Sequence, residues 1–292
     1  MPELPDLAVV ADAFHAALAG RSIESVEAPA PLAVRGTPAE LRTYEGQRIA
    51  AVRRRGKFVI FELAAGRIAI NPMLTGRLQL ATPGAPRPAS TAFVLRAGAR
   101  HGGPPSDAAR WTSGAPWLPL EAAPVEVRYR DPSQMGKVYL LATGTDRRPP
   151  GLGDAEQGPD ADDPKLTLEA WRSRIRRHPG ELKSLLRNQA FVAGIGNAYS
   201  DEILHAARLS PFRKRSTLAP DEVDELYAAM RRVLDDATTT LRERVPPTFE
   251  RQVRDLLRVH RRGGEPCPRC GTRITEISGR GEATSYCRGC QR

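Results

Sequence analysis

The sequence predicts an α+β protein in which a β-rich part is followed by a helical part and a short C-terminal β-hairpin. Up to about residue 145, short apolar runs and alternating stretches bounded by glycine and proline indicate strands. After about residue 165, apolar residues recur with helical spacing. All four cysteines lie after position 266, which sets the last segment apart from the rest of the chain.

Length and charge narrow the class of protein. A chain of 292 residues fits two domains, and a hydrophobic content of 40% excludes a fully disordered protein. No apolar run reaches the roughly 18 residues of a membrane span, and the N-terminus lacks the pattern of a secretory signal. We therefore expect a cytoplasmic protein. The net charge of +10, with its basic excess at the two ends of the sequence, favours a polyanionic partner over a role in solubility alone.

The β-rich part begins with a helix at Leu7–Leu18, where apolar residues follow helical spacing. Two strands are expected within Ala50–Leu63, joined near Gly56. The stretch Gly98–Pro124 is rich in Gly, Pro, Ser and Ala and predicts a long surface loop. Further strands are expected at Arg67–Asn71, Ala92–Arg96, Val125–Tyr129 and Lys137–Leu141.

A Pro-, Gly- and Asp-rich stretch at Thr143–Pro164 indicates an interdomain linker. The chain is thus expected to divide into a domain at 1–145, a linker at 146–164, a helical domain at 165–262 and a C-terminal segment at 263–292. Helices are predicted at Leu166–His178, Glu181–Asn188, Asn197–Ala207, Pro220–Val245 and Gln252–Val259.

The cysteines form two CxxC pairs with 16 residues between them, Cys267 with Cys270 and Cys287 with Cys290. Two such pairs can close on one tetrahedral zinc ion and leave no open position for water, which is the pattern of a structural site. The intervening residues suit a β-hairpin, and a segment this short needs the metal to hold its fold. Disulfides or free thiols are the alternatives.

The N-terminus offers a nucleophile. Removal of Met1 would leave Pro2 as a free secondary amine beside the carboxylate of Glu3. Such an amine can attack an aldehyde-like carbon and form an iminium, and an α-amino pKa near 7.7–8.0 leaves a useful neutral fraction at physiological pH. Taken alone, these residues fit an exposed and functionless N-terminus better than a nucleophile.

Four separated motifs carry a resemblance to a known family. They are Met1-Pro2-Glu3-Leu4-Pro5, Arg55-Gly56-Lys57-Phe58, the run from Val192 to Glu202, and Gly264-Glu265-Pro266-Cys267 with the paired cysteines. In this order they closely resemble the formamidopyrimidine-DNA glycosylase and endonuclease VIII family of base-excision repair enzymes, over nearly the whole chain. The resemblance implies an N-terminal two-layer β-sandwich with flanking helices, a helix–two-turns–helix domain and a β-hairpin zinc ribbon.

The resemblance also implies roles for individual residues. Pro2 matches the nucleophile that attacks C1′ of the damaged nucleotide, Glu3 the acid/base carboxylate, and Lys57 a lysine that contacts a phosphate near the lesion. Residues matching the family's DNA-binding positions are Lys183, Asn197 and Tyr199.

Within the run from Val192 to Glu202, the resemblance implies that Gly194 and Gly196 let backbone amides approach a phosphate at a helix N-terminus.

The sequence departs from the family where lesion and opposite base are contacted. Ser133 stands at the position of an arginine that pairs with the orphaned base, Met135 at that of a wedge phenylalanine, and Leu74 at that of a void-filling methionine. In the zinc hairpin, Glu282 occupies the position of a phosphate-binding arginine. We therefore expect Arg280, on the same strand face, to contact DNA.

We expect a bifunctional DNA glycosylase and AP lyase that contains one structural zinc ion and acts as a monomer on double-stranded DNA with damaged bases or abasic sites. The altered positions, with a short region before the zinc ribbon, predict a shifted base preference and weak discrimination of the opposite base. Formamidopyrimidine, 8-oxoguanine and oxidised pyrimidines all stay open as substrates. The alternatives are a non-catalytic or lyase-only binder of damaged or abasic DNA and a zinc-ribbon protein of the transcription or ribosomal machinery. The expected location is the bacterial nucleoid.

Overall fold

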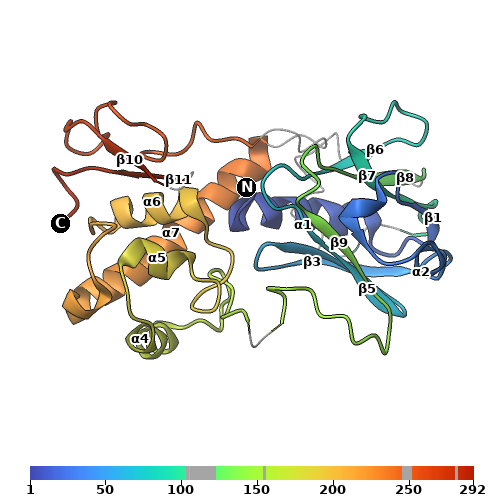
Figure 1. Ribbon diagram of the computed structural model, residues 1–292, viewed down its shortest axis with the longest axis horizontal. Coiled ribbons are helices and arrows are strands. Elements are labelled where there is room, and N and C mark those ends of the chain that lie inside the picture. The colour runs from blue at the N-terminus through green and yellow to red at the C-terminus, as the bar shows by residue number, and fades with distance from the viewer. Residues whose placement is uncertain (103–104, 106–122, 154–155, 245–251, 280–281) are drawn as a thin grey trace. The chain divides into compact units, whose positions relative to one another are not determined.

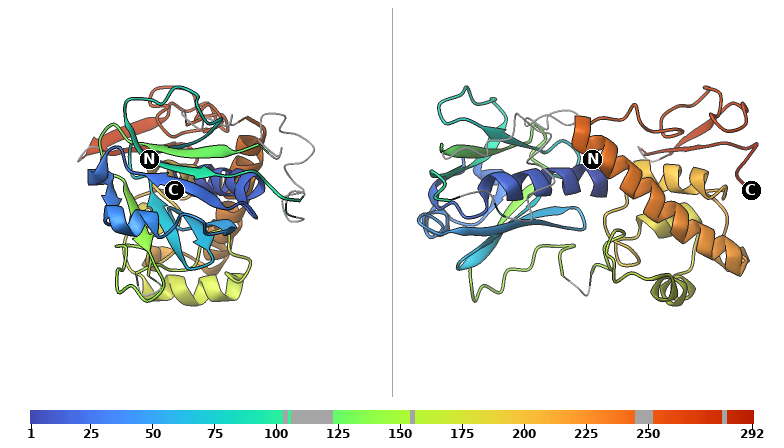
Figure 2. Two further views of the ribbon diagram at one scale, coloured as in Figure 1. Left: turned by 90° about the vertical axis from the view of Figure 1, so that its right-hand side faces the viewer. Right: turned by 180° about the vertical axis from the view of Figure 1, so that it is seen from behind.

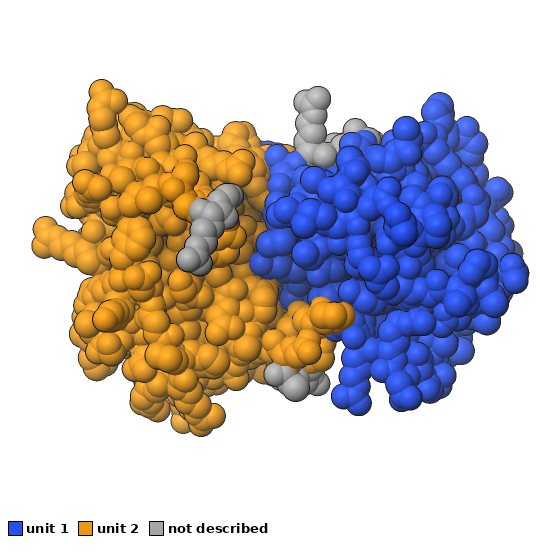
Figure 3. Space-filling model, in the orientation of Figure 1, with its two compact units in different colours: residues 1–2, 6–149, 241–252 blue, residues 3–5, 150–240, 253–292 orange. Residues whose placement is uncertain are grey.

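The computed structural model describes all residues except 103–104, 106–122, 154–155, 245–251 and 280–281 (Figure 1). The chain divides into two compact units (Figure 3). Unit 1 comprises residues 1–2, 6–149 and 241–252, and unit 2 comprises residues 3–5, 150–240 and 253–292. Both helices and sheets are present, as the predicted α+β class requires. Among the described residues, every helix is too short or too polar to cross a membrane.

Unit 1 contains two sheets, which form separate layers in Figure 1. One has the strand order β1-β7-β8-β6 and is antiparallel throughout. The other has the order β2-β9-β5-β4-β3, in which only the β2–β9 pair is parallel. The strands are β1 (Ile23–Glu27), β2 (Val34–Arg35), β3 (Ile49–Arg55), β4 (Phe58–Leu63), β5 (Gly66–Asn71), β6 (Arg77–Ala81), β7 (Thr91–Ala97), β8 (Val125–Arg130) and β9 (Lys137–Leu141).

Helix α1 (Leu4–Leu18) is apolar along most of its length, and Phe14 packs its ring against Phe61 of β4 with centroids 6.1 Å apart. The end of α1 is closed by two buried arginines. Arg21 donates to the carbonyl of Ala17, and Arg100 donates to the carbonyls of Ala16, Ala17 and Ala19. These bonds satisfy carbonyls that a helix leaves without partners at its C-terminus. Burial, with the neighbouring Arg100, lowers the pKa of Arg21 to about 10.

The strands predicted in the β-rich part are confirmed to within a residue or two, but the sequence did not reveal β1, β2, β6 or the short helix α2 (Pro38–Arg42). The missed strands lack a clear apolar signal, because β2 has only two residues and β6 buries Gln79 between two leucines. The predicted loop at Gly98–Pro124 falls mostly outside the described residues.

Unit 2 is built on four helices within the described residues, α4 (Leu168–Arg177), α5 (Leu182–Arg187), α6 (Asn197–Ala206) and α7 (Pro220–Arg244). Trp171 lies at the centre of the core, with ring centroids 4.9 Å from Phe191 and 5.9 Å from Tyr227. The indole nitrogen of Trp171 donates to the carbonyl of Val223 at 3.1 Å, so this buried polar atom is satisfied. Ala161, from the stretch that the sequence suggested as a linker, is buried in the same core.

The helix predicted at Gln252–Val259 is wrong, since this segment is irregular, with a turn at 255–256 and a bend at 258–259. The physical reason is a long-range contact. The backbone amides of Arg258, Val259 and His260 all donate to the carboxylate of Glu202, at 2.8–2.9 Å, in place of helical partners. A buried carboxylate requires such donors, and the amides that donate to it are not available to the carbonyls of a helix.

The C-terminal segment forms the predicted hairpin. Strands β10 (Thr275–Gly279) and β11 (Glu282–Tyr286) pair antiparallel from Thr275↔Tyr286 to Gly279↔Glu282. The buried residues beneath the hairpin are Val259, Cys267, Ile274 and Cys287. This core is very small, so the hairpin depends on a further source of stability.

Candidate functional site

The carboxylate of Glu3 lies at the N-terminus of α6. Its Oε2 accepts hydrogen bonds from the backbone amides of Gly196 (2.7 Å) and Tyr199 (3.2 Å), and its Oε1 accepts one from Ala198 (2.8 Å). The first amides of a helix have no partners within the helix and carry the positive end of its dipole. The negative side chain of Glu3, which is 3% exposed, is therefore held in place by the start of α6.

The glycines before α6 make room for this contact. A Cβ on Gly196 would lie 2.5 Å from Cδ of Glu3, and one on Gly194 would lie 2.9 Å from Cβ of Leu4. Gly194 also has a φ of +99°, which side chains rarely tolerate. We expected these glycines to admit a phosphate. In the structure the glycines make room for Glu3 and Leu4, and Glu3 occupies the helix N-terminus, while a phosphate contact of this motif stays a prediction.

Pro2 and Lys57 belong to unit 1. Pro2 is buried, although Met1 before it is 37% exposed, and it is bonded directly to Glu3. Lys57 lies in the two-residue turn between β3 and β4, where Arg55 pairs with Phe58. Arg53 on β3 is exposed, so basic groups lie near this turn.

The residues predicted to bind phosphate in unit 2 lie together beside β11. Lys183 is 6% exposed, and its Nζ donates to Oδ1 of Asp201 (2.7 Å), to the carbonyl of Ala283 (3.0 Å) and to Oγ1 of Thr284 (3.0 Å). Nδ2 of Asn197 donates to the same carbonyl of Ala283 at 2.9 Å. Burial lowers the pKa of Lys183, and the neighbouring Asp201 opposes part of this effect.

Tyr199 is buried, and the guanidinium of Arg254 lies 5.6 Å from the centre of its ring. This distance is within the range of a cation–π contact.

Two acidic residues of α6 were missed by sequence reasoning. Asp201 accepts hydrogen bonds from Lys183, from Nδ1 of His260 (2.7 Å) and from the amide of Ser285 (3.2 Å), and Glu202 accepts the three amides described above. The signal was present in the sequence as two adjacent acids inside a predicted helix. Asp201 links α6 to β11 through the amide of Ser285, and Glu202 links α6 to the backbone just before the C-terminal segment.

Unit 1 presents two apolar side chains on adjacent loops. Leu74 is 49% and Met135 47% exposed. Each follows a residue with a left-handed backbone, Met73 with φ 49° and Gln134 with φ 52°. Such conformations cost energy in residues other than glycine and cluster at functional sites.

The two loops are fastened by Asp131, which is 1% exposed. Its carboxylate accepts hydrogen bonds from the hydroxyls of Thr75 and Ser133 and from the amide of Gly136 (2.8 Å). Burial acts to raise the pKa of Asp131, but these hydrogen bonds outweigh it and lower the pKa. The hydroxyl oxygen of Ser133 also lies close to that of Thr75. The side chain of Ser133 is therefore engaged within the protein.

Glu282, at the position where the family has an arginine, forms an ion pair with Arg187. Arg280, which we expected to contact DNA, lies outside the described residues.

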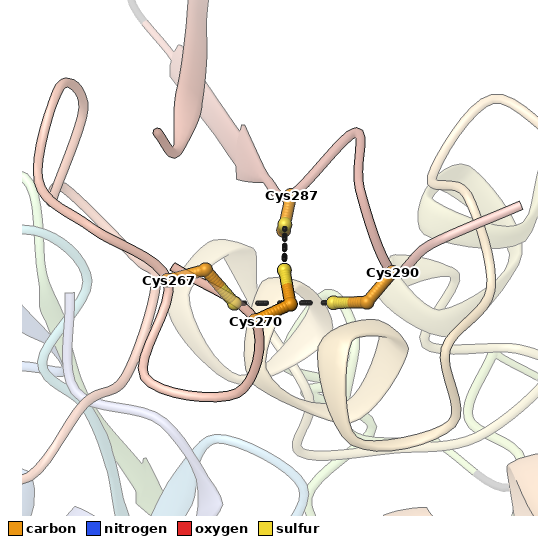
Figure 4. A group of neighbouring side chains, drawn as sticks. All are labelled: Cys267, Cys270, Cys287 and Cys290. Atoms are coloured by element: carbon orange, nitrogen blue, oxygen red, sulfur yellow. Dashed lines mark hydrogen bonds between the residues drawn. The ribbon is translucent and has the colours of Figure 1, made fainter. Parts of the chain in front are cut away.

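The four cysteines come together around one point. The sulfur atoms all lie within 4.8 Å of one another, and in Figure 4 they converge from the two ends of the hairpin. Cys267 and Cys290 are 3.9 Å apart and Cys270 and Cys287 3.4 Å apart at sulfur. A tetrahedral ion with Zn–S bonds near 2.3 Å requires sulfur separations of about 3.8 Å. The residues present fit a structural zinc ion, which the thiolates of Cys267, Cys270, Cys287 and Cys290 would hold.

The fold and these sites match those of a DNA glycosylase with a zinc finger. The family models described as the formamidopyrimidine-DNA glycosylase N-terminal domain, its H2TH domain and the zinc finger found in FPG and IleRS match residues 1–138, 157–245 and 264–292. The chain belongs to the formamidopyrimidine-DNA glycosylase family.

Individual relatives span the same length. The formamidopyrimidine-DNA glycosylases of Symbiobacterium thermophilum and Thermomicrobium roseum are each 33% identical, over 100% of this chain and 89% and 99% of theirs. The Lactococcus lactis enzyme in complex with DNA containing an abasic site has a TM-score of 0.80 at 25% identity, covering 99% of both chains. The same enzyme bound to DNA containing N7-benzyl-Fapy-dG has a TM-score of 0.81 at 26% identity, covering 100% of both.

The close approach of Gly196 to Glu3 predicts a cost for any side chain at this position. Gly196→Ala should destabilise the protein by about 1–3 kcal/mol, because overpacking forces one of the two residues to move. Urea denaturation would measure this, with Gly153→Ala as the control, since nothing lies within 4 Å of a Cβ there. Equal stability of the two variants would contradict the assignment.

Zinc removal should unfold the C-terminal hairpin, because its core is too small to persist without the metal. After zinc is removed by a chelator, we expect rapid hydrogen exchange at β10 and β11, while the amides of α4 and α7 stay protected. Thiol titration should then count the four cysteines. Unchanged protection of the hairpin, with metal analysis proving zinc loss, would show that the ion is dispensable.

Proposed function

We propose that this protein is a base-excision repair DNA glycosylase with AP lyase activity, in which the nitrogen of Pro2 is the nucleophile. The observation that carries the proposal is the Pro2–Glu3 pair, whose carboxylate is fixed by three amides of α6. Solved relatives that bind abasic-site DNA and Fapy-dG DNA support it. We further propose that a domain at 1–145 carries catalysis, with a linker at 146–164, a helix–two-turns–helix domain at 165–262 and the zinc ribbon at 263–292. The protein would act as a monomer in the cytoplasm, on the nucleoid.

The reaction follows from the chemistry of the two residues. Once Met1 is removed, the lone pair of the Pro2 nitrogen attacks C1′ of the damaged nucleotide, and the bond from C1′ to the base breaks with the electron pair leaving on the base. Opening of the sugar ring gives an iminium between C1′ and Pro2. Loss of a C2′ proton then eliminates the 3′ phosphate, and a second elimination removes the 5′ phosphate.

Glu3 moves protons in these steps. It is the residue bonded to Pro2, and its carboxylate is fixed by hydrogen bonds from α6. General acid–base catalysis of this kind contributes about 10²–10⁴-fold. Its proposed roles are to assist ring opening and to accept and return protons. A fixed carboxylate saves the reorganisation that a mobile one would require.

Recognition requires the target nucleotide to leave the helical stack, at a cost of a few kcal/mol. We propose that Lys57, Lys183, Asn197 and Tyr199 contribute phosphate contacts that offset this cost. Lys183 and Asn197 both donate to the carbonyl of Ala283 in the free protein, so a phosphate would share or replace that acceptor. Arg280 is proposed for the same role from its position in the sequence.

Leu74 and Met135 are proposed to fill the space that the flipped nucleotide leaves. Both are exposed and apolar, and both stand on the loops that Asp131 fastens together. Ser133 has a short side chain that donates to Asp131 and lies close to Thr75, so it cannot reproduce the forked donor set of an arginine. We therefore propose that these two apolar side chains fill the gap by packing alone and that the protein discriminates weakly among opposite bases.

The proposed nucleophile predicts a covalent adduct on one atom. Borohydride reduction in the presence of abasic-site DNA should trap the protein, and mass spectrometry should place the adduct on the nitrogen of Pro2. Inserting Ala between Met1 and Pro2 keeps every side chain but turns that nitrogen into an amide, so trapping should fall sharply. No adduct at all would favour a non-catalytic binder, whereas an adduct on Lys57 would refute Pro2 as the nucleophile.

The loss of an arginine at position 133 predicts weak opposite-base discrimination. A base contact of that kind is worth about 1–3 kcal/mol, so excision opposite the four bases should differ by less than about tenfold. Duplexes with 8-oxoguanine, formamidopyrimidine or an oxidised pyrimidine would measure this. Ser133→Arg should raise the discrimination and Ser133→Ala should not. A strong preference for 8-oxoguanine opposite cytosine in the unaltered protein would refute the proposal.

A further inference from the structure

A histidine from α6 reaches the zinc site. His205 lies in the last turn of the helix, its residue is 1% exposed, and its Nε2 is 3.3 Å from Sγ of Cys267. Cys267 is itself 3% exposed. A buried imidazole needs a partner for its polar atoms, and this sulfur provides one. The two residues are 62 positions apart in the sequence, so no local pattern would have paired them.

The direction of the hydrogen bond follows from the chemistry of the site. Cysteine binds zinc as the thiolate, which has no proton and can only accept. The proton must therefore lie on Nε2 of His205, which donates to Cys267. Four thiolates around one Zn²⁺ leave two negative charges in a partly buried place, and an N–H directed at one sulfur offsets part of that charge.

We propose that His205 is a positioning residue of the zinc site, which holds the thiolate of Cys267 in its ligating orientation and fastens the zinc ribbon to α6. Groups that hydrogen-bond to metal ligands orient them and tune the metal, and their loss typically costs about 10–100-fold in metal affinity. The proposal concerns the stability of the site and is independent of the proposed enzyme activity.

A second contact supports the same attachment from the opposite direction. Arg269, between the first two cysteines, donates from NH1 to the carbonyl of His205 at 2.7 Å and from NH2 to that of Ala206 at 3.4 Å. Cationic groups are favoured at the C-terminus of a helix, where the last carbonyls lack partners. NH1 of Arg269 also lies 3.8 Å from Sγ of Cys290. His205 of α6 thus donates a hydrogen bond to the zinc ribbon, and Arg269 of the ribbon donates hydrogen bonds to the end of α6.

The test compares variants that lose or keep the donor. His205→Phe keeps a ring of similar size without the N–H, and His205→Gln keeps an N–H on a side chain of similar reach. His178→Phe is the control, because the ring of His178 packs on Phe191, with centroids 5.2 Å apart. Zinc transfer from each folded protein to a chromogenic chelator is followed over time.

We expect zinc transfer to be at least about tenfold faster in His205→Phe than in the unaltered protein, with His205→Gln intermediate and His178→Phe unchanged. In the cobalt-substituted proteins, the thiolate-to-metal charge-transfer band should move to lower energy in His205→Phe, since a sulfur without its hydrogen bond is easier to oxidise. Equal zinc transfer and equal band positions in all four proteins would overturn the proposal. Faster release without a band shift would also do so, because it would indicate a packing defect alone.

A measurement on the unaltered protein avoids any loss of folding in the variants. Nitrogen NMR of the zinc-loaded protein reports which ring nitrogen of His205 carries the proton. A proton on Nε2, protected from exchange with solvent, is the expected result. A proton on Nδ1 alone would leave Nε2 without a hydrogen to donate to the thiolate and would overturn the proposal.

Discussion

The hydrogen bonds from the start of α6 to Glu3 are the interaction on which the rest of the site depends. The first amides of a helix must find acceptors, and a buried carboxylate must find donors, so each satisfies a requirement of the other. The arrangement leaves no room for a side chain on Gly196 and sets the path of the chain before the helix. It also fixes the residue that follows Pro2. The chemistry proposed for the N-terminus therefore depends on a helix about 190 residues later in the sequence.

The same helix also holds the chain from residue 258 onward, because α6 carries two further acids that accept hydrogen bonds from it. Asp201 is bonded to Lys183 and His260, and Glu202 takes three amides in a row. Removing one partner of a buried charge costs far more than the pair contributes, so these contacts specify a single arrangement. Burial raises the pKa of Glu202, and the three amides oppose that shift. From its first turn to its last, α6 thus joins the N-terminal glutamate to the zinc ribbon.

Local patterns in the sequence predicted the structural features that depend on residues close together in the chain. The CxxC spacing predicted the cysteine cluster, and alternating or helical apolar spacing predicted most strands of unit 1 and the four helices of unit 2. The failures arise from long-range polar contacts. The segment at Gln252–Val259 has a helical pattern, but Glu202 binds its amides. The sequence also did not reveal that Glu3 folds back onto Gly196, because the two residues lie 193 positions apart. The roles of Lys57, Lys183, Asn197, Tyr199 and Arg280 in binding DNA remain predictions.

The site around Glu3 and the loops that carry Leu74 and Met135 differ in how tightly the fold constrains them. Glu3 is held by backbone amides, and a side chain on Gly196 would collide with it. We therefore expect few substitutions to be tolerated at Glu3 and Gly196. Leu74 and Met135 are exposed at loop tips, and what fixes the loops is Asp131 beneath them. A side chain at a tip can change without disturbing that carboxylate, as long as Thr75 and Gly136 keep their bonds to it. Under the proposed function, the side chains at the loop tips can therefore vary while the residues proposed for the reaction stay fixed. In this chain the hydroxyl of Ser133 donates to Asp131, so this side chain helps to hold the two loops together.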